Sequence, residues 1–352
     1  MIILSLDTSC DETAVAITCN TKVLSNAVWS QISLHSKFGG VMPSLAQRAH
    51  EERIDFVTNK AIKKSGINIK DIDAIAVTIG PGLAIALGVG INKAKKLAKQ
   101  YKKPLIPINH VEAHLLSSFA TSSTKNNLKI SFPALGLVIS GGTTELILIN
   151  DIGKYEVLAE TVDDALGEAL DKAARLLGFG YPGGAILEKI AKNGIVNKYS
   201  LPLPLINDKE KNRFSYSGLK TAFVRLYEKE KKLNKQDFFD FASTFQDTAF
   251  EHIINVLKYQ IIKIQNQKID IKDLLLGGGV ANNVVIKNKL RKLCREKNLK
   301  LHIPYTKKLN GDNAAMIGVS AYLKTKDENL KKYFNFEKID RNPKVNLKDK
   351  SS

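Results

Sequence analysis

The sequence predicts an α/β protein made of two lobes of related plan, and three observations lead to this prediction. A strand–turn–strand pattern spans residues 2–18, where apolar runs flank the polar stretch "DTSCDET", and the same pattern returns at 133–150. Helical runs follow each of these hairpins, an order typical of α/β folds. A length of 352 residues suits one large domain or two medium ones.

In the first half, apolar periodicity predicts a helix at 43–64, a strand at 74–79, a helix ending in "NKAKKLAKQYKK", a strand at 104–109 and a short helix carrying His110 and His114. The uncharged run 74–91 is long enough for a membrane span, but Pro81 and Gly82 divide it. We therefore expect a buried strand that turns into a helix, and no membrane contact. The polar stretch "TSSTKNN" at 121–127 predicts a linker and a domain boundary.

The second half continues from the hairpin at 133–150 into a helical region. Helices are predicted at 164–178, 183–193, 217–232 and 236–265. The stretches 273–283 and 301–324 each have the pattern of a strand, a glycine-rich or polar loop and a helix. From about Asp327 the chain is mostly polar and Lys-rich, and we expect a loosely held tail.

The composition is that of a globular protein with a strong basic excess. Lys and Arg number 53 against 35 Asp and Glu, which gives a net charge of +18. Such an excess attracts polyanions, most often nucleic acid, although charge spread along a Lys-rich chain is also typical of a solvated surface. Three cysteines without CxxC spacing favour free thiols in a reducing compartment. The start of the chain lacks the basic lead-in of a signal peptide, so we expect a cytoplasmic protein.

Three loops at predicted strand ends have the composition of phosphate-binding turns. They are "DTSCDET" (7–13), "SGGTT" (140–144) and "LGGGVANN" (276–283). Glycine lets a backbone approach a ligand closely, and a helix N-terminus directs free N–H groups at an anion. One such loop is most often only a turn, whereas three in one chain favour a nucleotide or phosphate ligand.

The stretch "NHVEAH" places His110 and His114 four residues apart, on one face of a helix. Two neutral imidazoles can bind a metal if an oxygen ligand joins them, and Asp312 in "NGDNAAM" directly precedes the last predicted helix. Glu112 lies off the histidine face, unlike the glutamate of the HExxH peptidases. Spacing alone leaves open both a metal site and a pair of ordinary helix histidines.

Taken together, these motifs resemble the tRNA threonylcarbamoyladenosine transferase family, whose members were once named O-sialoglycoprotein endopeptidases. The motifs that carry the resemblance are "SLDTSCDET", "HVEAH", "ISGGTTEL", "DDALGEALDKAARLLG", "YPGG", "FSYSGLKTA", "GGGVANN" and "GDNAAMIG". They follow the family order from residue 1 to about residue 324. The resemblance implies transfer of a threonylcarbamoyl group from threonylcarbamoyl-adenylate to the exocyclic amine of the adenosine next to the anticodon, in tRNAs that read codons beginning with A, with release of AMP.

The resemblance also implies the two-lobed fold of the actin, hexokinase and heat-shock ATPase superfamily, with a ribonuclease-H-like mixed sheet and flanking helices in each lobe. We therefore expect a first lobe at 1–130 plus 303–326 and a second lobe at 131–302, followed by the polar tail at 327–352. The metal histidines, the first hairpin and the final helix would belong to the first lobe, and the nucleotide and substrate motifs to the second.

The site residues that the resemblance implies fall into two sets. One divalent metal ion per subunit, iron rather than zinc, is expected on His110, His114 and Asp312. Contacts to threonylcarbamoyl-adenylate are expected from Val138, Ile139, Ser140, Gly141, Gly142, Asp171, Gly184, Glu188 and Asn283. The implied partners are tRNA, a shorter paralogous subunit and a small ATPase subunit.

The chain departs from the usual family pattern at several of these positions. Thr143 stands where the family usually has His, Glu188 where Asp is frequent, and Asn282 where a small residue is usual. A longer acid at 188 keeps the charge but extends the arm, and a polar contact at the nucleotide turn is expected to differ at 143. None of these changes touches the three expected metal ligands.

Asp11 and Glu12 in the first hairpin are our candidates for removing a proton from the attacking amine, although adjacent acids in a turn are often only turn residues. Two lysine-rich stretches, 92–103 and 287–300, are candidates for tRNA contact, with a solvated helix face as the alternative.

Three rival functions would use some of the same motifs. A metallopeptidase would use the histidine pair, but it lacks a glutamate base on the ligand face and has no need of three phosphate loops. A phosphotransferase or regulatory ATPase of the same superfamily would use the loops but would not need the histidines and Asp312. A scaffold subunit, like the shorter paralogues, would be expected to lack the histidine pair.

Overall fold

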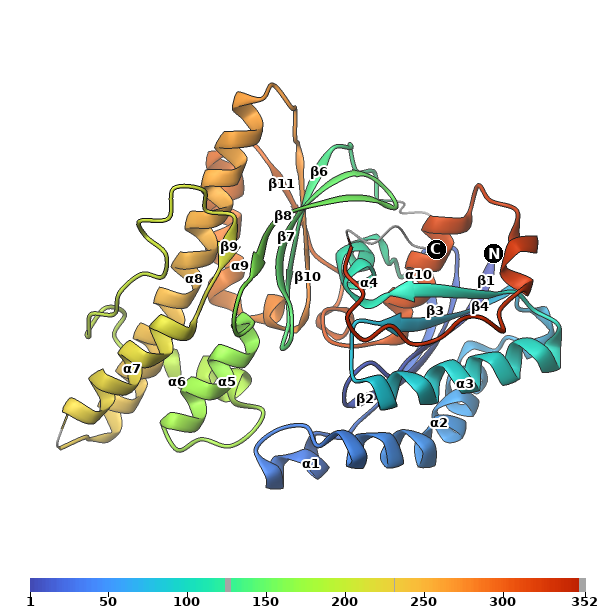
Figure 1. Cartoon of the computed structure of the whole chain (residues 1–352), viewed down its shortest axis with the longest axis horizontal. Coiled ribbons are helices and arrows are strands. Elements are labelled where there is room, and N and C mark those ends of the chain that lie inside the picture. The colour runs from blue at the N-terminus through green and yellow to red at the C-terminus, as the bar shows by residue number, and fades with distance from the viewer. Residues whose placement is uncertain (124–127, 231, 348–352) are drawn as a thin grey trace. The chain divides into compact units, whose positions relative to one another are not determined.

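The computed structural model describes residues 1–123, 128–230 and 232–347, and the chain divides into two compact units. The first unit comprises Met1–Ile130, Asp151–Tyr155 and Ile303–Ser352, and the second Ser131–Asn150 and Glu156–His302. Each unit contains a sheet with flanking helices (Figure 1). Part of the expected linker at 121–127 lies outside the described residues.

The sheet of the first unit has the strand order β3-β2-β1-β4-β5. Its strands are β1 (Ile2–Asp7), β2 (Glu12–Cys19), β3 (Lys22–Ser30), β4 (Ala74–Gly80) and β5 (Leu105–Asn109). β1, β2 and β3 are antiparallel neighbours, whereas β4 runs parallel to β1 and β5 parallel to β4. The parallel strands are connected through helices, as parallel pairing requires.

The sheet of the second unit repeats this plan in the order β11-β10-β6-β7-β8-β9. Its strands are β6 (Ala134–Ile139), β7 (Thr144–Asp151), β8 (Lys154–Thr161), β9 (Arg213–Phe214), β10 (Asp273–Gly277) and β11 (Lys300–His302). The β6–β7 hairpin corresponds to β1–β2, β8 to β3, and the parallel strands β10 and β11 to β4 and β5. Sequence patterning predicted both hairpins but missed β3 and β8, whose polar and charged residues interrupt the apolar runs.

The alternation of side chains along β1 decides which of its residues face which helices. Leu4 and Leu6 pack in a core cluster with α2 (Pro43–Ser65) and α3 (Ala84–Tyr101). Ile3 packs on the other face, with α4 (His110–Leu116) and α10 (Ala314–Thr325), and Ser5 donates to the carbonyl oxygen of Ala314 there at 2.6 Å. Asp7, two residues further along the strand, therefore faces α4 and α10.

Among its described residues, the second unit carries five α-helices at the predicted places. They are α5 (Leu166–Leu176), α6 (Gly183–Ala191), α7 (Ser217–Lys229), α8 (Lys235–Asn266) and α9 (Val284–Glu296). The long helix α8, yellow to orange in Figure 1, begins with a capping box in which the side chains of Asn234 and Asp237 satisfy each other's backbone N–H groups. A four-residue helix, α1 (Ile32–His35), precedes α2 in the first unit.

The expectation of a loosely held tail is wrong for the described part of the C-terminus. Residues Leu330–Phe334 form a 3-10 helix, and Phe336 is buried in the core of the first unit. The polar composition concealed this because one buried aromatic side chain and several backbone hydrogen bonds hold the segment. Among the described residues, no helix has the length and apolar character needed to span a membrane.

Candidate metal centre and substrate site

The helix α4 begins at His110, so both histidines of "HVEAH" are helical. Because they are four residues apart, they lie on one face of this helix. The side chain of Asn109 caps it, accepting hydrogen bonds from Val111 N at 2.8 Å and Glu112 N at 3.2 Å. The centroids of the two imidazole rings are 4.6 Å apart, with the ring planes at 79°. Glu112 is buried beside them and accepts a hydrogen bond from the Tyr155 hydroxyl at 2.9 Å, so it is not a free base on the histidine face.

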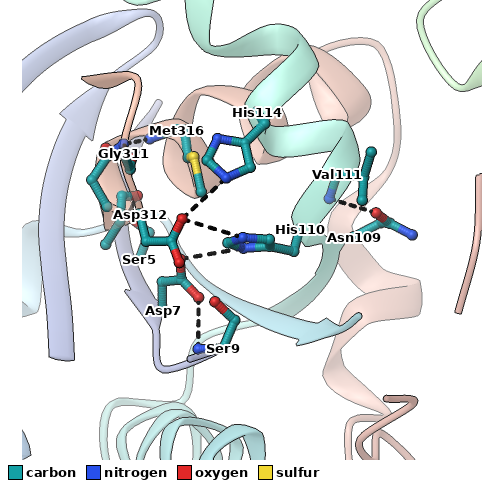
Figure 2. A network of polar contacts seen from close by, with 12 residues as sticks. Ser5, Asp7, Ser9, Asn109, His110, Val111, His114, Gly311, Asp312 and Met316 are labelled. Atoms are coloured by element: carbon teal, nitrogen blue, oxygen red, sulfur yellow. Dashed lines mark hydrogen bonds and ion pairs between the residues drawn. The ribbon is translucent and has the colours of Figure 1, made fainter. Parts of the chain in front are cut away.

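Asp312, in the loop before α10, completes a cluster with these histidines (Figure 2). Its Oδ1 atom lies 3.1 Å from His114 Nε2 and 3.5 Å from His110 Nε2, and one ligand atom from each of the three residues lies within 4.8 Å of the others. Metal bonds of about 2.0–2.2 Å at tetrahedral angles place ligand atoms about 3.3–3.6 Å apart. The cluster therefore has the donor set and the spacing to hold one divalent cation.

The cluster is also electrostatically suited to a cation. Burial alone would raise the pKa of Asp312, but the adjacent imidazoles outweigh burial and hold that pKa well below its usual range. Burial lowers the pKa of His114, which favours the neutral form that binds metals. Burial would also lower the pKa of His110, but the carboxylates of Asp7 and Asp312 outweigh it and raise that pKa well above its usual value.

Asp7 belongs to the turn predicted to bind phosphate, but the sequence did not indicate its position beside His110. Its Oδ2 atom lies 3.4 Å from His110 Nδ1, whereas Asp312 faces the other ring nitrogen, Nε2 (Figure 2). Both Asp7 Oδ2 and His110 Nδ1 are buried, and neither has another hydrogen-bond partner among the described residues. A metal-binding histidine commonly directs its second ring nitrogen at a carboxylate, which fixes the ring. The alternation along β1 could have indicated Asp7, had the helices on that face been known.

The polar turn between β1 and β2 holds the two candidate acids, Asp11 and Glu12. Asp11 is buried, and its carbonyl oxygen accepts a hydrogen bond from Gln31 N at 2.9 Å. Glu12 accepts a hydrogen bond from the Ser30 hydroxyl at 3.1 Å, and burial together with the charges of Asp312 and Asp11 raises the pKa of Glu12. A carboxyl group whose pKa is raised to about 10 is protonated near neutral pH, so Glu12 is a poor candidate base.

His50 on α2 contacts this turn, and the sequence did not predict this role. Its Nδ1 atom lies 2.8 Å from the Thr13 hydroxyl oxygen, and its Nε2 atom lies 3.0 Å from the carbonyl oxygen of Cys10. Burial lowers the pKa of His50, so a neutral ring donates to Cys10 and accepts from Thr13. The sequence gives no sign that a histidine so far along the chain reaches the first hairpin.

In the second unit, the turn between β6 and β7 is open. Ser140 is half-buried, Gly141 and Gly142 are exposed, and a Cβ atom at either glycine would meet nothing within 4 Å. Val138 and Ile139 are fully buried in β6. Neither residue therefore presents surface to a ligand in this structure, whereas the turn Ser140–Gly142 does.

The remaining expected substrate contacts lie on helices that are linked to one another. Asp171 Oδ1 on α5 accepts a hydrogen bond from Gly184 N at the start of α6, at 2.6 Å, and burial raises the pKa of Asp171. Glu188 on α6 accepts from Val284 N at 3.0 Å. Asn283 caps α9 through Val285 N at 2.9 Å.

The start of α5 joins this set to the open turn. Gly167 N donates to the carbonyl oxygen of Ser140 at 3.2 Å, and Glu168 N donates to that of Gly141 at 3.2 Å. A Cβ atom on Gly167 would lie 2.5 Å from the Ser140 carbonyl oxygen, so only glycine allows this approach. Apart from Val138 and Ile139 in β6, the expected contact positions of the second unit thus belong to one hydrogen-bonded set of turn and helix starts.

Comparison with known proteins agrees with this arrangement. The model of the family tRNA N6-adenosine threonylcarbamoyltransferase matches residues 22–319. Relatives of that name include one from Thermosipho africanus, 44% identical over 324 residues (92% of this chain and 94% of the relative). Another, from Persephonella marina, is 42% identical over 340 residues (96% of this chain and 94% of the relative).

Solved structures support the fold alone, because their sequences are distant. HypF from T. kodakarensis superposes with a TM-score of 0.59 at 16% identity, covering 95% of this chain and 49% of that one. Component A of the (R)-2-hydroxyglutaryl-CoA dehydratase of Acidaminococcus fermentans gives 0.52 at 12% identity, covering 92% and 98%. The predicted mixed α/β class, with a sheet and flanking helices in each of two units, is confirmed. Because the family model matches residues 22–319 and the two relatives are 44% and 42% identical over nearly the full length, the chain belongs to the tRNA N6-adenosine threonylcarbamoyltransferase family.

Proposed function

We propose that the chain transfers the threonylcarbamoyl group of threonylcarbamoyl-adenylate to the adenosine next to the anticodon in tRNAs that read codons beginning with A. Membership of the family gives the reaction class, threonylcarbamoyl transfer to N6 of an adenosine in tRNA. The single observation that carries the proposal is the convergence of His110, His114 and Asp312. Because tRNA is the substrate, we place the reaction in the cytoplasm.

The proposed reaction breaks the bond between the carbamoyl carbon and the phosphate oxygen of the donor. A new bond forms between that carbon and the exocyclic nitrogen, AMP leaves, and the amine loses one proton. The amine is a poor nucleophile because its lone pair is delocalised into the ring. Catalysis must then rest on orientation of the two substrates and on stabilisation of the charge that develops on oxygen.

We propose that His110, His114 and Asp312 hold one divalent metal ion, iron rather than zinc. When bound, such an ion would act as a Lewis acid toward oxygen atoms of the donor. Asp7 fixes the ring of His110 through Nδ1 and leaves Nε2 free for the ion. This assignment is supported by the distances within the cluster and by the low pKa of Asp312, which remains ionised at any physiological pH.

The open turn of the second unit is the proposed donor site. Backbone N–H groups and the hydroxyl of Ser140 can receive the phosphate and adenosine of the donor, with Asp171, Gly184, Glu188 and Asn283 on the adjoining helix starts. The exposure of Gly141 and Gly142 supports this role, because a ligand can approach their backbone without displacing a side chain. Asp11 is the proposed acceptor of the amine proton.

The lysine-rich faces of α3 and α9 are the proposed contacts for the tRNA backbone. On α3, Lys93 is paired with Asp55 at 2.6 Å, and Lys95 donates to the carbonyl oxygen of Glu337 at 2.8 Å. Lys103, just after the helix, donates to the carbonyl oxygen of Lys70 at 3.0 Å, which leaves the exposed Lys96, Lys99 and Lys102 for phosphate. On α9, Lys289 is paired with Asp247 at 2.8 Å. Neutralising a face that binds tRNA should weaken binding and reduce its salt dependence.

On the family resemblance, we also propose two protein partners, a shorter paralogous subunit and a small ATPase subunit. Large apolar side chains exposed around α1 and α2 support a protein-binding surface in this region. They are Leu34, Phe38, Met42 and Phe56. Copurification of the tagged full chain from its own cells, followed by mass spectrometry, tests which subunits accompany it.

The function is tested by transfer in a purified system. The chain, its copurified subunits, threonylcarbamoyl-adenylate and unmodified tRNA are incubated, and the tRNA is digested to nucleosides for mass spectrometry. We expect threonylcarbamoyladenosine with the wild-type chain and none above background with His114→Ala. The matched control is His302→Gln, which alters a histidine of the second unit that is paired with Asp273 at 2.6 Å, and it should retain the product.

Two results would overturn the proposal. One is absence of threonylcarbamoyladenosine in the complete purified system, and the other is an unchanged level of this nucleoside in the tRNA of cells depleted of the chain. Metal-dependent cleavage of a protein by the pure chain, abolished by His114→Ala, would instead favour a peptidase.

A further inference from the structure

The segment Phe336–Val345, which we call the C-terminal strap, lies beyond the family-matched residues 22–319 and packs against the rest of the first unit. Phe336 is 9% exposed and belongs to the core cluster on the α2 and α3 face, with Ile339 packed beside it. Lys95 on α3 donates to the carbonyl oxygen of Glu337 at 2.8 Å. The strap is therefore anchored at its start by an apolar side chain and by a helix lysine.

The strap then reaches the turn between β4 and α3. Asn342 N donates to the carbonyl oxygen of Ile79 at 2.7 Å, and Gly82 N donates to that of Pro343 at 3.3 Å. A Cβ atom on Gly80 would lie 1.9 Å from the Asn342 carbonyl oxygen. Because no real Cβ tolerates such a distance, the glycine at 80 is what lets the strap approach this turn.

The same turn holds the first hairpin on its other side. Leu83 N donates to the carbonyl oxygen of Ser9 at 2.8 Å, and a Cβ atom on Gly82 would lie 2.5 Å from that oxygen. Ser9 N donates to Asp7 Oδ1 at 3.1 Å, and Asp7 Oδ2 faces His110 Nδ1 at 3.4 Å (Figure 2). A continuous series of close contacts thus runs from the strap through the turn and the hairpin to His110.

We propose that the C-terminal strap is a positioning element of the centre formed by His110, His114 and Asp312. Each group in the series is buried or in a backbone hydrogen bond, so displacing the strap would free the turn at 80–83 and then Ser9. The carboxylate of Asp7 would lose its orientation toward His110, and a ring held by a misplaced carboxylate binds a cation less well. The part of this proposal that concerns the cation rests on the proposed function.

The test exploits the fact that the strap contacts the turn through its backbone. Asn342→Pro removes the N–H group that donates to Ile79, whereas Asn342→Ala, the matched control, keeps it. In the full chain, amide hydrogen exchange at Ser9 and Leu83 is measured together with Zn2+ affinity by competition with a chelator. With Asn342→Pro we expect exchange at these two amides to be about tenfold faster and Zn2+ affinity to be about tenfold weaker. Asn342→Ala should match the wild-type chain in both.

A second variant decides the question if Asn342→Pro does not fold. Arg341 Nη1 donates to the carbonyl oxygen of Ala84 at 3.2 Å, and Arg341→Ala removes this contact without changing the backbone. It should accelerate exchange at Leu83 by about threefold, since one exposed hydrogen bond is lost. Wild-type exchange at Ser9 and Leu83 in every folded strap variant would overturn the proposal.

Failure of the proposed function would give a different result. If the wild-type chain binds Zn2+ no better than His114→Ala, the metal centre is refuted, while the exchange measurements still decide whether the strap fixes Ser9. If wild-type Zn2+ binding is tight and Asn342→Pro matches Asn342→Ala in affinity, the strap has no positioning role toward the centre.

Discussion

The two hairpin turns of the molecule have the same place in sheets of the same plan, yet they differ in burial. The turn after β1 is packed: Asp7, Ser9 and Asp11 are almost fully buried, and His50 and the β4–α3 turn hold its backbone. The turn after β6 is open, with Gly141 and Gly142 exposed and free space where a Cβ atom would stand.

This difference in burial suits the two turns to different roles. A packed turn presents little of its backbone to solvent, but it can hold a carboxylate in one orientation, as Asp7 is held against His110. An open turn cannot fix a side chain, but it leaves backbone N–H groups accessible to a phosphate. One plan thus gives a packed turn beside the proposed cation site in one unit and an accessible turn backbone in the other, and variants in each turn should separate the two properties.

The largest effect is expected from the ligand atoms themselves. His114→Ala or Asp312→Ala removes one of three converging donors, so Zn2+ affinity should fall by more than about 100-fold, the upper range for loss of an outer partner alone. Chelator competition measures this, and the transfer assay should lose activity in parallel. Ser140→Ala in the open turn is the control and should keep wild-type Zn2+ affinity. Equal losses in all three variants would contradict the separation of the two turns.

A smaller effect on the same property is expected at Asp7. Asp7→Asn keeps the shape of the side chain but removes the negative charge that faces His110 Nδ1 at 3.4 Å. Zn2+ affinity should fall by about 10- to 100-fold, while the melting temperature should change little because the amide can still accept from Ser9 N. Unchanged affinity would show that Asp7 does not orient His110.

Variants in the open turn after β6 should change the KM of the donor and leave Zn2+ affinity unchanged. Gly141→Val places a branched side chain where a Cβ atom meets nothing within 4 Å, so the fold should be unaffected. If the donor binds here, its KM should rise by roughly tenfold, with no change in Zn2+ affinity. Gly167→Ala is the variant to compare with Gly141→Val. Its Cβ atom would lie 2.5 Å from the Ser140 carbonyl oxygen, so it must shift the turn. A wild-type KM in Gly141→Val would place the donor elsewhere.

The same contrast explains which parts of the site could be predicted from the sequence. The hairpins, the helices and the spacing of His110 and His114 follow from local periodicity. Asp312 was a candidate from its loop position before the last predicted helix, and the resemblance supported it. Asp7 and His50 could not be found in this way, because their roles depend on which helix covers which face of β1 and on a contact between α2 and the first turn. The strap was missed for a related reason, since polar composition does not reveal backbone hydrogen bonds to a distant turn.

A further comparison concerns the imidazoles of the two units. His110 lies between two carboxylates, which raise its pKa, whereas His252 on α8 is buried and accepts a hydrogen bond from Ser215 N at 3.3 Å. Burial, together with the charge of Lys211, lowers the pKa of His252 from 6.5 to about 4. The folded chain therefore keeps His252 neutral at a pH where the unfolded chain protonates it.

The smallest effect, on stability alone, follows from the lowered pKa of His252. Because this pKa is lower in the folded state, the contribution of His252 to the free energy of unfolding is complete above pH 6.5 and is lost as the pH falls toward 4. The free energy of unfolding should fall by about 3 kcal/mol, since each unit of difference between the folded and unfolded pKa corresponds to about 1.36 kcal/mol. His252→Gln, which can still accept from Ser215 N, should flatten this part of the pH profile, measured by denaturant unfolding at pH 7 and pH 4. If both chains lose the same free energy over this range, His252 is not the titrating group, and the acid sensitivity of the fold must come from its carboxylates.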